Sequence, residues 1–193
     1  MSDLNKSSMR SKVLTRLENI DRHDFQRHSE MVCQNILGIP DVQNASCVMA
    51  YLSQPPELDL DPLLRTLLAK GIHIAVPDVG ASGHEMQPIE LHSLDESELD
   101  VDRFGIRTPC IHKEICPTFI DVIIIPGVAF SSNGARLGRG AGFYDRFLNS
   151  ISDQPLRIGA CFDVQNVASI PTASHDIEMH MVVTESSIMD CKA

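Results

Sequence analysis

Glycines and arginines crowd into one short segment of this chain, which runs from Gly134 to Asp145. Its glycines leave backbone N–H groups open to an approaching anion, and they permit positive φ angles. Arg136 and Arg139 add planar guanidinium groups that suit phosphate oxygens. Asp145 adds a carboxylate, the kind of ligand that Mg²⁺ prefers. The segment therefore predicts a phosphate site with a metal ion beside it.

The glycine spacing by itself is a weak signal. Gly138-x-Gly140-x-Gly142 is not the Gly-x-Gly-x-x-Gly of dinucleotide-binding folds, and the chain has no Gly-Lys-Ser/Thr of a P-loop. One alternative is a tight strand-to-helix turn whose arginines point into solvent. A second, a dinucleotide-dependent oxidoreductase, depends on the glycines alone and lacks the expected ribose-binding acid.

An apolar strand is expected to deliver the chain to this loop. Residues 122–125 read Val-Ile-Ile-Ile and are followed by Pro126-Gly127. Ligands of open α/β sheets gather at the carboxyl ends of such strands. A short helix is expected from about Tyr144 to Ser150, with the positive end of its dipole toward the same place.

The remaining periodicities predict an α/β fold. Apolar residues recur at helical spacing over 4–20, 25–37 and 60–68, and short apolar runs at 46–52, 72–76, 156–162 and 181–184 read as strands. Strand, helix and strand over 46–76 form a βαβ unit with parallel strands. Residues 85–89 give a weaker strand, and 94–102 an acidic, solvated segment. We expect a single domain over 1–193: a mainly parallel sheet with helices on both faces.

Composition narrows the class of protein. The 193 residues are 43% hydrophobic and carry a net charge of −10, which repels nucleic acid unless basic residues gather on one face. A bound anion must therefore be held by a few local cations. The six cysteines form no Cys-x-x-Cys pair and are expected to be reduced thiols. Without an apolar signal core or a membrane-length stretch, we expect a cytoplasmic protein, a monomer or weak homo-oligomer, whose partners are small molecules.

The segment from Pro126 to Arg146 resembles the signature of the 5-formyltetrahydrofolate cyclo-ligase family. It carries Pro-Gly-Val-Ala-Phe at 126–130 and then Gly134-x-Arg136-Leu137-Gly138-Arg139-Gly140-x-Gly142-Phe143-Tyr144-Asp145-Arg146. Further similar stretches follow in family order over nearly the whole chain: 6–10, 51–57, 105–106, 171, 175–176 and 182–185. The resemblance implies an enzyme that uses ATP and Mg²⁺ to convert 5-formyltetrahydrofolate to 5,10-methenyltetrahydrofolate, releasing ADP and phosphate through a phosphorylated formyl intermediate.

The resemblance also implies overlapping groups of site residues. The ATP-binding group is Lys6, Arg10, Arg136, Leu137, Gly138, Arg139, Gly140, Gly142 and Tyr144. The substrate-binding group is Leu52, Glu57, Met86, Arg139, Gly140 and Phe143. Arg136, Arg139 and Tyr144 are the catalytic group, and Asp145, then Asp176, are the metal ligands, with His175 as an orienting neighbour.

Each of these residues also has a simpler interpretation. Lys6 and Arg10 share a helix face and can be a solvated pair, Glu57 an exposed loop acid, and Asp176 a cap. Three positions depart from the commonest family pattern, and they put the folate contacts in question: Thr108, Ser131 and His180. A non-catalytic homologue that binds reduced folate or nucleotide on the same fold therefore remains an alternative.

Overall fold

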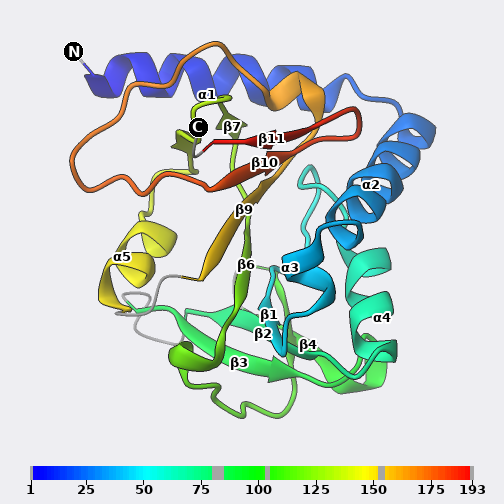
Figure 1. Cartoon of the computed structure of the whole chain (residues 1–193). Helices are drawn as coiled ribbons and strands as arrows, with labels where there is room; N and C mark the ends of the chain where they lie inside the picture. The colour runs from blue at the N-terminus through cyan, green and yellow to red at the C-terminus, as the bar shows by residue number, and fades with distance from the viewer. Residues whose placement is uncertain (1, 80–84, 103–104, 152–154, 192–193) are drawn as a thin grey trace.

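A seven-stranded sheet organises the molecule, in the order β11-β10-β9-β6-β1-β2-β3 (Figure 1). The computed structural model describes residues 2–79, 85–102, 105–151 and 155–191. The strands are β1 (Cys47–Met49), β2 (His73–Asp78), β3 (Gln87–Leu91), β6 (Val122–Ile125), β9 (Leu156–Ala160), β10 (Met181–Val183) and β11 (Ile188–Asp190). Strands β10, β9, β6, β1 and β2 run parallel, and the edge strands β3 and β11 run antiparallel to their neighbours.

The central strand β6 is buried on both faces, which explains its unbroken apolar sequence. Val122 and Ile124 pack into one hydrophobic cluster, and Ile123 and Ile125 pack into the cluster on the other face. The period of two along the strand thus supplies side chains to two cores.

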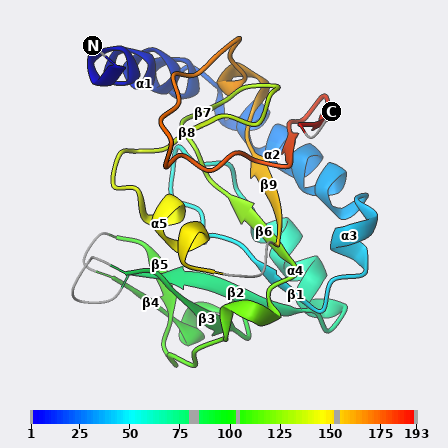
Figure 2. The same cartoon turned by 60° about the vertical axis from the view of Figure 1, so that its left-hand side comes forward.

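Helices cover both faces of the sheet, as predicted. They are α1 (Ser2–Glu18), α2 (Arg22–Leu37), α3 (Pro40–Gln43), α4 (Asp61–Ala69) and α5 (Phe143–Ser150). Figure 2 shows α5 on one side of β6 and β9, with α2, α3 and α4 on the other. Helices α1, α2 and α4 contribute residues such as Leu17, Ile36 and Leu64 to one hydrophobic cluster. Helix α5 contributes Phe147 and Leu148 to the cluster on the other face of the sheet.

Two small hairpins lie outside the main sheet. Strands β4 (Leu99–Val101) and β5 (Arg107–Pro109) pair where the sequence predicts only an acidic, solvated segment. Strands β7 (Ala129–Phe130) and β8 (Arg136–Leu137) form the second hairpin, inside the glycine-rich region. Short 3₁₀ helices cover Glu96–Glu98, Pro117–Phe119 and Asp163–Gln165.

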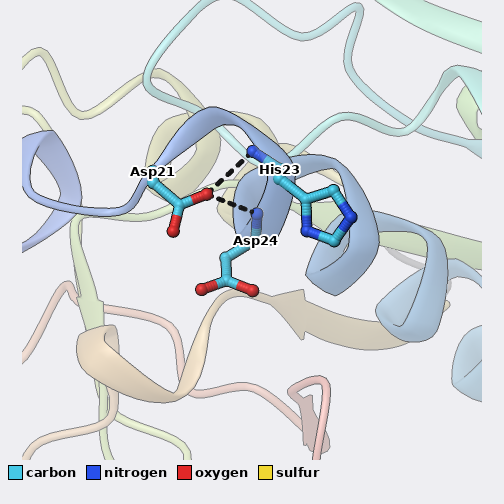
Figure 3. Close-up of side chains that lie close together, drawn as sticks. All are labelled: Asp21, His23 and Asp24. Carbon is cyan, nitrogen blue, oxygen red and sulfur yellow. Dashed lines mark hydrogen bonds between the residues drawn. The ribbon is translucent and has the colours of Figure 1, made fainter.

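The acidic group at the start of α2 is a helix cap. Asp21 accepts hydrogen bonds from the backbone N–H groups of His23 and Asp24, each at 2.9 Å (Figure 3). The Asp24 N–H is the main cause of the lowered pKa of Asp21. Among the described residues, these three side chains are the one group of metal-type ligands gathered closely enough for an ion. Their geometry is that of an N-cap.

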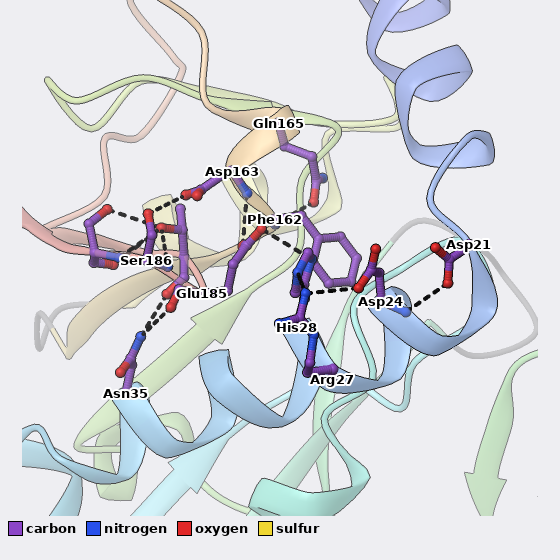
Figure 4. A network of polar contacts seen from close by, with 12 residues as sticks. Asp21, Asp24, Arg27, His28, Asn35, Phe162, Asp163, Gln165, Glu185 and Ser186 are labelled. Carbon is purple, nitrogen blue, oxygen red and sulfur yellow. Dashed lines mark hydrogen bonds and ion pairs between the residues drawn. The ribbon is translucent and has the colours of Figure 1, made fainter.

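A polar network ties α2 to the end of β10 (Figure 4). The His28 ring lies 3.4 Å from Glu185, which also accepts the backbone N–H of Asp163 at 2.9 Å. Asn35 donates to the carbonyl of Thr184 at 2.8 Å. The network fixes the 3₁₀ turn at 163–165, and Gln165 at its end accepts the Phe162 N–H at 2.9 Å.

The cysteines and the helices are relevant to the class of protein that the sequence predicts. The six cysteines are free thiols, and three of them are buried. None of the helices in the described part of the chain combines the length and the apolar character that crossing a membrane requires.

Candidate active site

A cavity of about 1090 Å³ lies at the carboxyl ends of the parallel strands. Its walls include Leu52 after β1, Pro77 in β2, Gly127 after β6 and Ala160 at the end of β9. This is the edge where ligands of open α/β sheets bind. The volume slightly exceeds the usual range for a small-molecule site.

The glycine-rich loop forms one wall of this cavity. Gly142 has φ 69° and directly precedes α5, and Gly140 has φ 115°. Both conformations favour glycine because a side chain would be strained there. Gly138, Gly140, Gly142 and Phe143 all line the cavity, so the N-terminus of α5 faces it as predicted.

Arg136 is buried at the base of the loop, with 7% of its side chain exposed. Its Nη2 donates to Asp145 Oδ2 at 2.8 Å, and its Nη1 donates to the Pro126 carbonyl at 3.4 Å. The other oxygen of Asp145 accepts the Ile177 N–H at 3.2 Å. The predicted phosphate-binding arginine and the predicted metal ligand are therefore partners of each other.

Arg139 belongs to the same loop but faces solvent, with 56% of its side chain exposed. Its Nη2 is 3.1 Å from Glu57 Oε1, and Glu57 Oε2 accepts the Gln54 N–H at 3.2 Å. The contact joins a residue predicted to bind both ligands to a residue predicted to bind the folate.

Helix α1 contributes side chains to another wall of the cavity. Lys6 donates to Asp176 Oδ2 at 2.8 Å, and Arg10 Nε donates to the Gly138 carbonyl at 2.8 Å. Burial opposes charge on Asp176, but Lys6 and the Ala173 N–H outweigh it, so the pKa of this carboxyl is lowered. His175 Nε2 lies 3.7 Å from Asp176 Oδ1 and 76% of the His175 side chain is exposed, so its role as an orienting neighbour stays a prediction. Lys6 and Arg10 are thus partly buried cavity residues with partners from other elements.

Apolar side chains line another part of the cavity. Leu52, Met86, Phe143 and Tyr144 are all wall residues. The Arg146 guanidinium lies 5.0 Å from the centre of the Phe143 ring. Burial raises the pKa of Tyr144, the charge of Glu57 raises it further, and Arg136 lowers it. The cavity is therefore lined both by cations and by aromatic and aliphatic side chains.

One predicted site residue lies elsewhere. The Leu137 side chain is buried in the hydrophobic core and is not among the cavity-lining residues, while its carbonyl accepts the Val128 N–H at 2.7 Å. An apolar residue beside β7 packs inward, so only its backbone is near the loop. All other predicted site residues line the cavity.

Several cavity residues were missed by the sequence-based assignment. They are Gln54, Arg107, Arg146, Asn149 and Gln165 among others. Gln165 donates to the carbonyls of Gly127 and Val128 at 2.8 and 3.2 Å, which holds the backbone at the cavity floor. Arg107 binds both oxygens of Asp61 at 2.8 and 2.6 Å. Arg146 and Gln54 had a sequence signal, because Arg146 directly follows the glycine-rich motif and Gln54 lies within the stretch 51–57 that resembles the family.

The three departures from the family pattern lie away from the walls. Among the described cavity-lining residues, Thr108, Ser131 and His180 do not occur. Ser131 is buried and donates to Asn133 at 2.6 Å, and His180 Nδ1 accepts the Arg157 N–H at 3.2 Å. The geometry therefore gives no support to the expectation that these three residues alter the folate contacts.

Comparisons with known proteins agree with this fold. The model of the 5-formyltetrahydrofolate cyclo-ligase family matches residues 3–185. The 5-formyltetrahydrofolate cyclo-ligase of Saccharomyces cerevisiae is 40% identical over 92% of this chain and 94% of its own length. The enzyme of that name from Escherichia coli (strain K12) is 32% identical over 86% of this chain and 92% of its own length.

A solved structure extends the likeness to three dimensions. The NMR structure of Aquifex aeolicus 5,10-methenyltetrahydrofolate synthetase has a TM-score of 0.85 and 32% identity, covering 97% of this chain and 93% of the other. A family match over most of the chain, relatives aligned over nearly their full lengths and a common fold lead to one conclusion. The chain belongs to the 5-formyltetrahydrofolate cyclo-ligase family of enzymes.

Proposed function

We propose that this chain uses ATP and Mg²⁺ to convert 5-formyltetrahydrofolate to 5,10-methenyltetrahydrofolate, with release of ADP and phosphate. The observation that carries the proposal is one cavity that is lined both by cations and by apolar side chains, and in which Arg139 contacts Glu57. A nucleotide and a folate ring system need these two environments side by side.

The reaction needs a poor leaving group to be made a good one. The formyl oxygen attacks the γ-phosphoryl group, ADP leaves, and the oxygen then joins the formyl carbon to phosphorus. The folate N10 attacks that carbon and loses its proton, and the C–O bond breaks so that phosphate leaves. The protein's main tasks are to position two ligands and to balance the charge of phosphate.

Cations from two elements suit the phosphate chain. Lys6 and Arg10 extend from α1, and Arg136 and Arg139 belong to the loop. The backbone N–H groups of Gly138, Gly140 and Gly142 add donors without side chains in the way. These groups would attract the β- and γ-phosphates and stabilise the charge that moves during transfer.

The apolar wall suits the pterin and benzoyl rings. Leu52, Met86 and Phe143 would contact the ring faces. The Tyr144 ring, which also lines the cavity, has the Arg136 guanidinium carbon 5.7 Å from its centre. Glu57 would accept hydrogen bonds from the pterin or receive the N10 proton. Arg139 would then bind phosphate in place of Glu57, or bridge the two ligands.

The residues of the cavity fit a magnesium ion bound with the nucleotide. Mg²⁺ usually takes one or two carboxylates, with phosphate oxygens and waters completing its shell. Asp145 and Asp176 both line the cavity, and each is balanced by a cation, Arg136 or Lys6, that phosphate also attracts. When bound, the ion supplies positive charge to the β- and γ-phosphate oxygens.

The test is turnover of the purified protein. With ATP, Mg²⁺ and 5-formyltetrahydrofolate, we expect the near-ultraviolet absorbance of the methenyl product to appear, together with one ADP per product. The variant Arg27→Ala should keep this activity, because Arg27 is an exposed arginine that pairs with Asp24 on α2. Folate binding by calorimetry without ADP release would contradict the proposal and favour the non-catalytic alternative.

A further inference from the structure

The chain has two tyrosines, and both line the cavity. The Tyr51 hydroxyl donates to the Leu58 carbonyl at 3.4 Å. The Tyr144 hydroxyl is buried and has no hydrogen-bond partner among the described residues. A buried polar group without a partner is destabilising, so proteins seldom keep one unless a ligand or water satisfies it.

A second unsatisfied donor lies on the neighbouring side chain. Arg136 uses Nη2 for Asp145 and Nη1 for the Pro126 carbonyl, while its Nε is buried without a partner in the described part of the chain. The Arg136 guanidinium carbon lies 5.7 Å from the centre of the Tyr144 ring. Both residues line the same cavity. Two neighbouring unsatisfied donors suit a ligand that presents an acceptor oxygen.

Tyr144 lines the cavity together with Glu57 and Arg136. Burial is the largest influence on its ionisation and raises the pKa of Tyr144, so the hydroxyl keeps its proton at any physiological pH. It is therefore a neutral donor in a cavity that a carboxylate and a guanidinium also line.

We propose that the Tyr144 hydroxyl and the Arg136 Nε–H donate hydrogen bonds to the oxygen that passes from the formyl group to phosphate. The inference depends on the proposed function, because only that reaction carries one oxygen from a carbon in the folate to a phosphorus in the nucleotide. In that reaction this oxygen lies where the two ligands meet, and both donors belong to residues that line the cavity proposed to hold the ligands.

The donors act when the bond between this oxygen and carbon breaks. N10 has by then bonded to the formyl carbon and lost its proton, and the electron pair of the C–O bond moves onto the oxygen, which departs as part of phosphate. Donors that reach this oxygen in the bound state stabilise that charge. Tyr144 gives up no proton, since its phenol is a far weaker acid than phosphate.

Tyr144→Phe tests the inference against the matched control Tyr51→Phe. Thermal unfolding of the ligand-free proteins and steady-state kinetics with 5-formyltetrahydrofolate and ATP would be measured. Without ligand, removing the unsatisfied hydroxyl of Tyr144 should raise Tm by about 2–4 °C. In turnover, the same variant should lose about 10²-fold in kcat, with KM for ATP changed less than about threefold. Tyr51→Phe should show no rise in Tm and lose less than about threefold in kcat.

The outcomes separate the two proposals. If wild-type protein turns over and Tyr144→Phe is equally active, the donor role is wrong while the proposed function stands. A fall in the Tm of ligand-free Tyr144→Phe would show that the hydroxyl has a structural partner, which also overturns the inference. An inactive but folded wild-type protein would overturn the proposed function and the inference with it.

Discussion

Two arginines of one loop, Arg136 and Arg139, have opposite environments. Arg136 is 7% exposed and is held by Asp145 and the Pro126 carbonyl. Arg139 is 56% exposed and contacts Glu57 across the cavity. From the sequence they are equivalent, because both stand between glycines in the same motif.

The difference separates two tasks that a phosphate site needs. A buried arginine with fixed partners is part of the fold, and it presents donors to a ligand in a position that does not change. An exposed arginine on an open loop can leave its partner and follow the ligand, at little cost to stability. The first favours charge stabilisation in a fixed geometry, and the second favours capture of the ligand.

Replacing Arg136 by Ala should have the largest effect. Asp145 would lose its counter-charge in a partly buried position, so we expect a loss of about 3 kcal/mol in the free energy of unfolding. Activity should fall by at least 10³-fold, because a catalytic donor disappears as well. Denaturant unfolding and the absorbance assay measure the two losses. Unchanged stability would mean that Arg136 is not a fixed part of the fold.

Replacing Arg139 by Ala should affect function alone. We expect a loss of about 2–4 kcal/mol of transition-state stabilisation from kcat/KM. The free energy of unfolding should change by less than about 1 kcal/mol, as for other exposed ion pairs. Arg27→Ala, on α2, is the control for a general effect of removing an exposed arginine. A large loss of stability in Arg139→Ala would remove the contrast with Arg136.

Replacing Lys6 tests whether a cation contributes to stability because it is buried or because it belongs to the glycine-rich loop. It is as buried as its partner Asp176, but it belongs to α1. Lys6→Met should lower the free energy of unfolding by about 1 kcal/mol at pH 7. The pKa of Asp176 is lowered in the folded protein, so its contribution to stability is fully present above the ordinary aspartate pKa of 3.8 and is lost as the pH falls further.

The pH dependence of the free energy of unfolding therefore identifies the contribution of the ion pair between Lys6 and Asp176. Wild-type protein and Lys6→Met should differ in denaturant unfolding at pH 7 and converge well below pH 3.8. A difference between the two proteins that is unaffected by pH would mean that Lys6 acts through its hydrocarbon chain instead of its charge.

The smallest expected effect is the coupling between Arg139 and Glu57. A double-mutant cycle with Arg139→Ala and Glu57→Gln should give about 0.2–1 kcal/mol in the stability of the free protein. The coupling measured from kcat/KM should be larger, because ligands exclude water from the pair. Equal coupling in both measurements would show that the contact does not change during turnover.

Much of the fold was predictable because periodic apolar residues determine it. The leucines of α4 at helical spacing and the apolar runs of β1 and β2 predict a βαβ unit, and the structure confirms their parallel pairing. The antiparallel direction of β3 could not be predicted, because alternation over 85–89 shows a strand and not its partner. The two-residue strands β7 and β8 are too short to leave a periodic signal.

The site was predictable where chemistry is concentrated in sequence. Glycines, arginines and an aspartate in one segment led to the cavity wall, and the family motif added Lys6, Glu57 and Asp176 from distant segments. The pairing of Arg136 with Asp145 was not foreseen, because ion-pair partners depend on side-chain directions at the end of β8 and the start of α5. Gln165 was also missed, because a single buried amide has no pattern.

The contact between Lys6 and Asp176 spans 170 positions of the chain. During synthesis, α1 leaves the ribosome well before Asp176 and cannot form this contact until the 170 positions that separate the two residues have followed. This wall of the cavity is therefore completed only after Asp176 has emerged, since domains fold as units once their distant segments are available. We expect nascent chains that end before β10 to gain no protection from nucleotide.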